Sequence, residues 1–258
     1  HSSYRHSFYR KAFYVLFAAY VWRRPVVVHV HGSSFDEFLD TDRPWLARFQ
    51  SVVLGAASVV VVLSEYWRDV LAERVPEEQV VVLPNAVPAG EYDPAYGRDR
   101  QHVVFLSNLV ERKGVAEFAA AVDELATRDD LPPFDVTVAG AGPMADLASA
   151  LAADHEHVSY VGYVEEAEKR RLLEDATIYA LPTYAEGLPI AVLEAMAGGT
   201  ALLSTPVGSI PEVVGQDNGR LVAPGDDRAL ADALAELLES PGLVRRMART
   251  NRERACEE

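Results

Sequence analysis

The sequence predicts an α/β protein with two doubly wound parallel sheets, of which the first is incomplete. Apolar runs rich in β-branched residues alternate with helical patterns along nearly the whole chain. Most of the helical patterns span about ten residues or more, which is the length that a crossover between parallel strands requires. The apolar runs are continuous rather than alternating, as expected for strands in a sheet that helices cover on both faces.

The predicted elements follow these patterns in order. Strands are expected at 26–31, 59–64, 80–83, 103–107, 135–140, 158–161, 177–181 and 201–204. Helices are expected at about 7–22, 44–56, 65–74, 114–127, 143–153, 165–174, 189–197, 227–239 and 242–254. A stretch rich in proline, glycine and charge follows the third strand, and such a composition is typical of linkers. We therefore predict a partial N-terminal domain at 1–92, a linker at 93–101 and a complete C-terminal domain at 102–258.

The charge composition is strongly acidic and poor in lysine. The 258 residues carry a formal net charge of −15, and only Lys11, Lys113 and Lys169 among the 24 basic residues are lysines. This composition is typical of proteins from salt-loving archaea, and the alternative is an acidic protein from a GC-rich genome. In either case an acidic surface disfavours nucleic-acid binding, which requires the opposite charge.

Hydropathy and cysteine content exclude further classes of protein. The longest apolar run, Ala12–Trp22, is shorter than the roughly 20 residues that span a bilayer. Cys256 is the only cysteine, so the chain has no internal disulfide and no cysteine-based metal site. These features favour a reducing, cytoplasmic setting.

The segment 177–199 contains the most informative pattern. An apolar strand ends at Pro182, a short loop follows, and an apolar helix begins near Pro189. Glu194 interrupts this helix and needs a partner, because an isolated buried charge is costly. Glu186 lies in the loop, near the free N–H groups of Gly187 and Leu188 at the helix N-terminus, where an anionic or hydroxyl-rich ligand is favoured. The alternative interpretation is an acid that complements the helix dipole beside a capped core helix.

This segment and several others resemble family 4 retaining glycosyltransferases, which have the GT-B fold. Glu186-Gly-Leu-Pro followed by Glu194-Ala-Met-Ala-Gly-Gly resembles the E-x7-E signature of that family. Five further segments resemble family patterns in the same order: Leu83-Pro-Asn-Ala-Val87, Leu106-Ser-Asn-Leu-Val-Glu-Arg-Lys113-Gly114, Val138-Ala-Gly-Ala-Gly-Pro143, Thr205-Pro-Val-Gly-Ser-Ile-Pro-Glu212, and Asn218-Gly219 with Val222-Ala-Pro-Gly-Asp226. Ordered matches of this kind are specific to a family.

The resemblance implies a role for each matched residue. Glu186 would bind a hydroxyl of the donor sugar, Lys113 would neutralise the diphosphate leaving group, and His31 would face the donor sugar from the first domain. Glu194 would bind the ribose hydroxyls of the nucleotide. The remaining donor-binding residues would be Gly187, Leu188, Pro189, Asn108, Arg112, Gly140, Gly142 and Pro143. The implied reaction retains the configuration of the anomeric carbon, with attack on the face from which the diphosphate leaves.

Two features depart from the family pattern. Asn108 stands where the family usually has arginine and cannot supply the missing charge, so either Arg112 compensates or diphosphate binding is weaker. The family's N-terminal strand and glycine-rich loop have no match in this chain. We therefore expect residues 1–258 alone to have weak activity or none.

The predicted function is transfer of a sugar from a nucleoside-diphosphate donor to a glycan, a lipid-linked acceptor or a small molecule. An NAD-dependent oxidoreductase is an alternative, because Gly140-Ala-Gly142-Pro-Met-Ala145 fits a dinucleotide-binding pattern. An epimerase or phosphorylase with the same fold and a nucleotide-sugar-binding module without catalysis are others. We expect no metal or cofactor: Asp40-Thr41-Asp42 resembles an acidic metal motif but lies in a polar stretch typical of a solvated loop.

The N-terminal segment 4–24 is aromatic and basic, whereas the chain as a whole is acidic. One interpretation is a helix that lies on a membrane surface and brings the enzyme to lipid-linked acceptors. The other is a core helix of the first domain with solvated ends.

Overall fold

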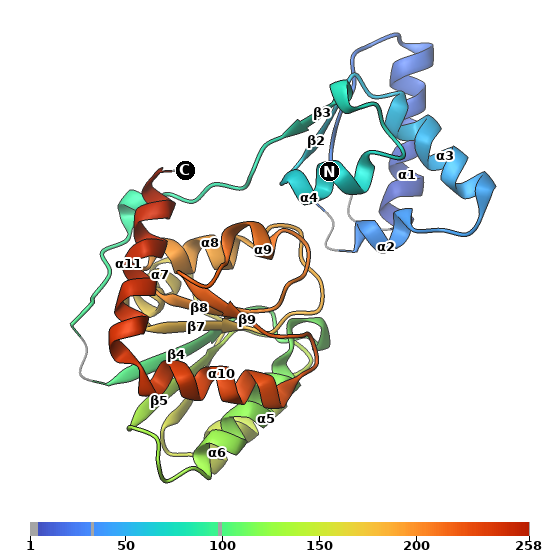
Figure 1. Cartoon of the computed structure of the whole chain (residues 1–258). Helices are drawn as coiled ribbons and strands as arrows, with labels where there is room; N and C mark the ends of the chain where they lie inside the picture. Colours follow the sequence, from blue (N-terminus) through green and yellow to red (C-terminus); the bar gives the residue numbers. More distant parts are fainter. Residues whose placement is uncertain (1–4, 32–33, 98–99, 258) are drawn as a thin grey trace. The chain divides into compact units, whose positions relative to one another are not determined.

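The structure, a computed structural model, describes residues 5–31, 34–97 and 100–257. Tyr4 of the aromatic and basic segment 4–24, and Arg98 and Asp99 of the predicted linker, lie outside these residues. The chain divides into two compact units (Figure 1). The first unit extends to Asn85 and includes Ala185–Leu188, and the second comprises Ala86–Tyr184 and Pro189–Glu258.

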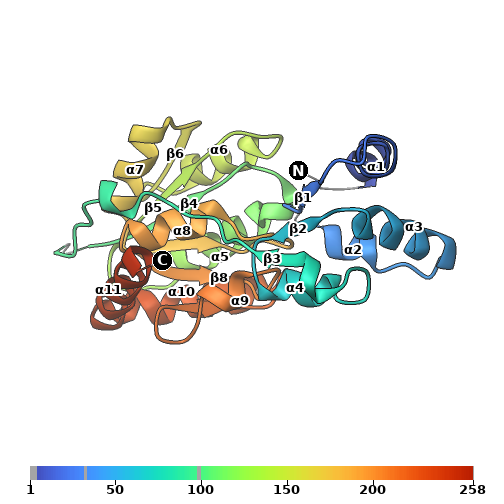
Figure 2. The same ribbon diagram turned by 90° about the horizontal axis from the view of Figure 1, so that it is seen from above.

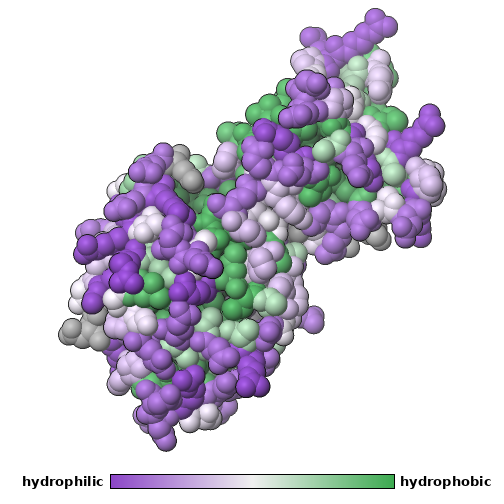
Figure 3. All heavy atoms as spheres, viewed as in Figure 1, coloured by the Kyte–Doolittle hydropathy of each residue, from purple (hydrophilic) through white to green (hydrophobic). Residues whose placement is uncertain are grey.

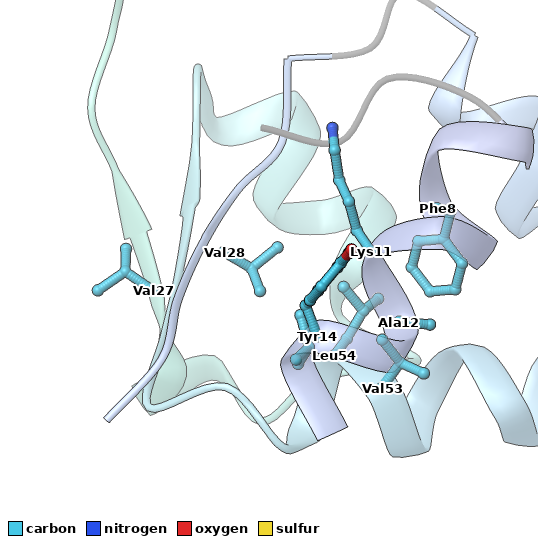
Figure 4. A pocket seen from close by; sticks show the side chains of 9 residues that line it. Phe8, Lys11, Ala12, Tyr14, Val27, Val28, Val53 and Leu54 are labelled. Carbon is cyan, nitrogen blue, oxygen red and sulfur yellow. The ribbon is translucent and has the colours of Figure 1, made fainter. Parts of the chain in front are cut away.

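The first unit contains a three-stranded parallel sheet in the order β1-β2-β3. Its strands are β1 (Val27–His29), β2 (Val59–Val62) and β3 (Val80–Val82). Its helices are α1 (Arg5–Leu16), which continues as a π-helix (Phe17–Val21), α2 (Phe35–Leu39), α3 (Pro44–Gly55), α4 (Glu65–Leu71) and a 3-10 turn (Glu77–Gln79). An apolar pocket of about 180 Å³ lies between α1, β1 and α3, where Phe8, Val28 and Leu54 contribute to its lining (Figure 4).

The second unit contains a six-stranded parallel sheet in the order β6-β5-β4-β7-β8-β9. Its strands are β4 (Gln101–Leu106), β5 (Phe134–Ala139), β6 (Val158–Gly162), β7 (Ile178–Leu181), β8 (Ala201–Ser204) and β9 (Gly219–Leu221). Its helices are α5 (Val115–Ala126), α6 (Ala145–Asp154), α7 (Glu166–Asp175), α8 (Ile190–Ala197), α9 (Ile210–Val213), α10 (Asp227–Glu239) and α11 (Pro241–Glu257), with 3-10 turns at Ala89–Glu91 and Glu111–Lys113.

Helices cover both faces of the second sheet (Figures 1 and 2). Helices α5, α6 and α10 pack together on one face, α7 and α8 lie on the other, and α11 contacts both α8 and α10. Every residue of β7 and of β8 is therefore buried, which explains why these strands are apolar on both sides. The strand order reverses between β4 and β7, and ligands bind at such a switch point in open α/β sheets.

The predicted fold class, two parallel α/β sheets, is confirmed. Besides the 3-10 turns, the described part of the chain contains three short elements that were not predicted: α2, α9 and β9. Strand β9 has only three residues, Gly219-Arg-Leu221, and pairs with β8 through its backbone without an apolar run of its own. The predicted helix at 7–22 is α-helical only to Leu16. The next five residues, Phe17–Val21, form a π-helix.

Candidate functional site

A cavity of about 370 Å³ opens in the second unit at the carboxyl ends of β4, β5 and β6. It is lined by Leu106, Ser107, Asn108, Lys113, Ala139, Gly140, Ala141, Tyr163, Val164, Glu166, Lys169, Ile190, Ala191 and Glu194. Four of the residues predicted from sequence, Asn108, Lys113, Gly140 and Glu194, thus share one cavity. Its position coincides with the switch point of the strand order.

The floor of the cavity depends on a close approach between the loops that follow β4 and β5. The Leu109 N–H donates a hydrogen bond to the Ala141 carbonyl at 2.9 Å, and the Met144 N–H donates one to the Leu109 carbonyl at 3.0 Å. Gly140 has a φ of 135°, and an added Cβ would lie 1.8 Å from the Ser107 carbonyl oxygen. Only glycine fits at this position, because both the backbone conformation and the space exclude a side chain.

Lys113 ends the 3-10 turn between β4 and α5, and the segment that follows β7 fixes the backbone on either side of it. The Arg112 carbonyl accepts hydrogen bonds from the Tyr184 N–H at 2.8 Å and from the Thr183 hydroxyl at 3.0 Å. Gly114 then has a φ of 74°, and a Cβ there would lie 2.0 Å from the Pro182 carbonyl oxygen. The half-buried Lys113 is therefore held at the cavity by contacts on both sides of its backbone.

Helix α8 contributes Glu194, whose side chain is only 10% exposed. Its carboxylate accepts a hydrogen bond from the Lys169 ammonium on α7, with 2.6 Å between Nζ and Oε1. Lys169 also lies 2.9 Å from the Glu166 carboxylate. Burial lowers the pKa of Lys169, but the hydrogen bonds to Glu194 and Glu166 outweigh this effect, so the pKa is raised. The expectation that Glu194 needs a partner is thus met.

Sequence reasoning missed the part of the cavity that follows β6, where Tyr163, Glu166 and Lys169 lie. The one available signal was the scarcity of lysine, since Lys169 is one of three in the chain. Tyr92, just before the predicted linker, is buried near this group. Burial and then the charge of Glu194 raise the pKa of its hydroxyl to about 12.

Other predicted residues lie elsewhere. Among the described residues, Arg112, Gly142, Pro143 and Pro189 belong to the second unit but do not line the cavity. Glu186, Gly187 and Leu188 lie in the segment that belongs to the first unit, where Glu186 is 6% exposed and the Leu188 carbonyl accepts a hydrogen bond from Asn85 at 2.7 Å.

His31 follows β1 in the first unit, and its ring lies 3.7 Å from that of His29 between centroids. Burial lowers the pKa of both imidazoles, and the neighbouring His29 lowers that of His31 further. Both rings are therefore neutral at pH 7. A Cβ at Gly187 would lie 3.5 Å from the His31 carbonyl oxygen, which places this backbone close to His31.

The groups in the cavity can bind a ligand that carries both hydroxyl groups and negative charge. The N-terminal turn of α8 reaches the cavity at Ile190 and Ala191, and helix N-termini favour anions. Lys113 adds an ammonium group, and Glu194 adds a carboxylate that accepts hydrogen bonds from hydroxyl groups. Within the described ranges, no group of three or more His, Cys, Asp or Glu side chains is arranged to hold a metal ion.

Comparison with known protein families decides the class of this protein. Residues 100–240 match the family described as "Glycosyl transferases group 1". The chain belongs to this family. Residues 3–91 match a second description, "Glycosyltransferase Family 4". Membership of a glycosyltransferase family favours the predicted sugar transfer over the oxidoreductase alternative.

Three curated relatives are similar to most of this chain. The MMP alpha-(1->4)-mannosyltransferase of Mycolicibacterium hassiacum is 30% identical over 246 residues, which cover 93% of this chain and 56% of the relative. The glycogen synthase of Mycobacterium tuberculosis is 30% identical over 218 residues, which cover 81% of this chain and 51% of the relative. The phosphatidyl-myo-inositol mannosyltransferase of Mycolicibacterium smegmatis is 27% identical over 228 residues, which cover 85% of this chain and 57% of the relative. The chain thus spans about half the length of these relatives.

Solved structures share the fold of this chain. HepE of Anabaena, in complex with UDP, aligns with a TM-score of 0.78 at 19% identity and covers 95% of this chain and 71% of that one. Sucrose-phosphate synthase from Thermosynechococcus elongatus aligns with a TM-score of 0.75 at 20% identity, and the alignment covers 90% of this chain and 63% of that one. These likenesses confirm the predicted GT-B fold.

Proposed function

We propose that this glycosyltransferase binds a nucleoside-diphosphate sugar in the cavity of the second unit and transfers the sugar with retention of anomeric configuration. The observation that carries the proposal is the single cavity at the switch point to which Lys113, Glu194 and the N-terminus of α8 all contribute. An ammonium group beside a helix N-terminus favours a diphosphate, and the buried carboxylate favours the hydroxyl groups of a ribose.

We assign the following roles within this proposal. Lys113 neutralises the charge that develops on the diphosphate as the glycosyl bond breaks, which lowers the barrier to transfer. Glu194 accepts hydrogen bonds from the ribose hydroxyls. By motif resemblance, Glu186 binds a hydroxyl of the donor sugar and His31 faces that sugar. The neutral state that burial imposes on His31 suits such a hydrogen-bonding role.

The acceptor in this proposal is a glycan or a lipid. The relatives support this choice, since one is a glycogen synthase and another a phosphatidyl-myo-inositol mannosyltransferase. In the first unit, Phe13, Tyr14, Tyr20 and Trp22 are each more than 60% exposed, beside basic residues at 10, 11, 23 and 24. This combination supports a membrane-surface contact of the described part of 4–24. No helix among the described residues has both the length and the hydrophobicity to cross a bilayer.

Calorimetric titration of the chain with UDP, GDP, their sugar conjugates and NAD tests the donor proposal. We expect one nucleoside diphosphate and its sugar conjugate to bind, and NAD to bind far more weakly. Tight binding of NAD without binding of any nucleotide sugar would contradict the proposal. Retention is tested separately, by NMR assignment of the anomeric configuration in the product.

Sedimentation with vesicles tests the membrane contact. We expect the chain to sediment with vesicles that contain anionic lipid at low salt and to remain in solution with neutral vesicles. Replacing Phe13 and Trp22 by Ser should weaken the sedimentation. Absence of binding to anionic vesicles at low salt would favour the alternative, a core helix with solvated ends.

A further inference from the structure

We infer that Lys169 is a positioning residue, which holds the Glu194 carboxylate in the orientation that accepts hydrogen bonds from the ribose of the nucleotide. The inference rests on the proposed function, because it assumes that a nucleotide occupies the cavity. Lys169 and Glu194 come from different helices, α7 and α8, and both line that cavity.

The geometry of the pair is that of a constrained ion pair rather than a surface contact. Lys169 Nζ lies 2.6 Å from Glu194 Oε1, and the two side chains are 19% and 10% exposed. Glu166, one turn earlier on α7, lies 2.9 Å from the same ammonium. The ammonium is thus held between a buried carboxylate and an outer one, which restricts the directions in which Lys169 can point.

Glu194 needs this restraint because of its surroundings. The rest of α8, Ile-Ala-Val-Leu before it and Ala-Met-Ala after it, is apolar, and most of these residues are buried. A carboxylate in such a setting without a cation tends to take up a proton or to turn toward water. The Lys169 ammonium supplies this cation, and its hydrogen bond occupies only one of the roughly four lone-pair directions of the carboxylate. Acceptor capacity therefore remains for hydroxyl groups that enter the cavity.

Two other roles for Lys169 make different predictions. A lysine that itself contacts the base or a phosphate would contribute to binding independently of Glu194. A lysine that only joins α7 to α8 would affect stability and would leave ligand selectivity unchanged. A positioning role predicts loss of the interactions that Glu194 makes, with the rest of nucleotide binding preserved.

The test is the preference of the chain for a ribonucleotide over its deoxy counterparts. Calorimetry on the 258-residue chain first identifies which of UDP and GDP binds, and then compares that ligand with its 2′-deoxy and 3′-deoxy forms. Since hydrogen bonds to a charged group are strong, we expect the wild type to prefer the ribonucleotide by about tenfold or more. Glu194→Gln should reduce this preference.

Variants of Lys169 then decide the inference. Lys169→Met removes the charge at similar length and should reduce the preference about as far as Glu194→Gln does. Lys169→Arg should retain most of it, because a cation remains. The double variant Lys169→Met with Glu194→Gln should lose no more than Glu194→Gln alone, since the two residues act as one unit. Arg171→Met, an exposed basic residue on the same helix, is the matched control and should keep the wild-type preference.

The outcomes separate the inference from the proposed function. If the wild type binds neither nucleotide, the proposed function fails, and the inference with it, before any variant is compared. If Lys169→Met weakens ribose and deoxyribose ligands equally and leaves the preference at its wild-type value, Lys169 does not act through Glu194 and the inference is overturned. Should Lys169→Met fail to fold in a thermal scan, Lys169→Gln replaces it, and an unchanged preference there overturns the inference equally.

Discussion

The two units of this chain differ in how completely their sheets are covered. In the second unit β7 and β8 are fully buried between two layers of helices. In the first unit Val27 of β1 is 66% exposed and Leu83, which follows β3, is 56% exposed. Apolar residues reach the surface of the first unit (Figure 3), and its pocket between α1, β1 and α3 is mostly apolar (Figure 4). This difference supports the proposed division of roles, in which the fully packed sheet binds the polar donor and the first unit offers apolar surface to a lipid or a protein.

The largest expected effect is on the stability of the second unit. Leu203→Ala, at a fully buried position in β8, should lower the free energy of unfolding by about 2–5 kcal/mol. The matched change Leu83→Ala, at an exposed position after β3, should stay within about 0.5 kcal/mol. Trp22, Trp45 and Trp67 all belong to the first unit, so tryptophan fluorescence reports on that unit alone and circular dichroism on both.

Urea unfolding followed with both probes tests this contrast. Leu203→Ala should shift the dichroism transition and leave the fluorescence transition in place. A shift of both transitions by the same amount would show that the two units unfold together, and the contrast between them would then not apply to stability.

A second prediction concerns glycines in the second unit. Gly114 and Gly162 have nearly equal φ values, 74° and 71°, but a Cβ would meet the Pro182 carbonyl at the first and nothing within 4 Å at the second. Gly162→Ala should therefore cost about 1–2 kcal/mol, from backbone strain alone. Gly114→Ala should cost more and should also weaken nucleotide binding, because the backbone beside Lys113 must move. Equal melting temperatures for the two variants would contradict the close contact between Gly114 and the Pro182 carbonyl.

The third prediction concerns the charge at Lys113. Lys113→Ala should weaken binding of the nucleoside diphosphate by about tenfold or more, because a charge-assisted contact is lost. Binding of the corresponding nucleoside, which lacks the diphosphate, should be unchanged. Arg171→Ala serves as the control for a loss of positive charge outside the cavity. Equal weakening of nucleoside and nucleoside diphosphate in calorimetry would place Lys113 away from the phosphates.

The smallest expected effect is a pH dependence of the first unit. Burial holds the pKa of His29 and His31 below the ordinary value of 6.5, so the unfolded chain binds protons more readily than the folded unit. The free energy of unfolding of the first unit is therefore highest above about pH 6.5. It falls as the pH drops from that value toward the lower pKa that the two histidines have in the folded unit. Fluorescence-monitored unfolding should show this loss, and His29→Gln with His31→Gln should reduce it.

His157 provides the control for this pH dependence. Its pKa is also lowered by burial, but it lies in the second unit. His157→Gln should leave the pH dependence of the tryptophan signal unchanged. If instead His157→Gln removes it, the protonation that destabilises the first unit does not occur at His29 and His31.

Much of the fold follows from the sequence, because long apolar runs with helical patterns between them specify covered parallel strands. Strand β8 and helix α10 begin and end at the predicted residues, 201–204 and 227–239. Strand β9 was missed because Gly219-Arg-Leu221 has no periodicity and is a strand only through its pairing with β8. Short elements of this kind depend on tertiary contacts that local patterns do not contain.

The candidate site was accessible from sequence only in part. Ordered motifs pointed to Lys113, Asn108, Gly140 and Glu194, which line one cavity. Lys169 belongs to no motif, and its contact with Glu194 exists because α7 packs against α8. The burial of Glu194 in an apolar helix predicted that a partner exists, but the identity of that partner required the packing of the two helices.

Hydrogen exchange of the chain, with and without the nucleoside diphosphate that binds, tests most directly whether the second unit holds the nucleotide. We expect slower exchange in the segments around the cavity, at 106–114, 139–142, 163–169 and 190–194. Residues 34–85 of the first unit should change little by comparison. Protection confined to the first unit, with exchange around the cavity unaltered at saturating ligand, would contradict the proposed donor site.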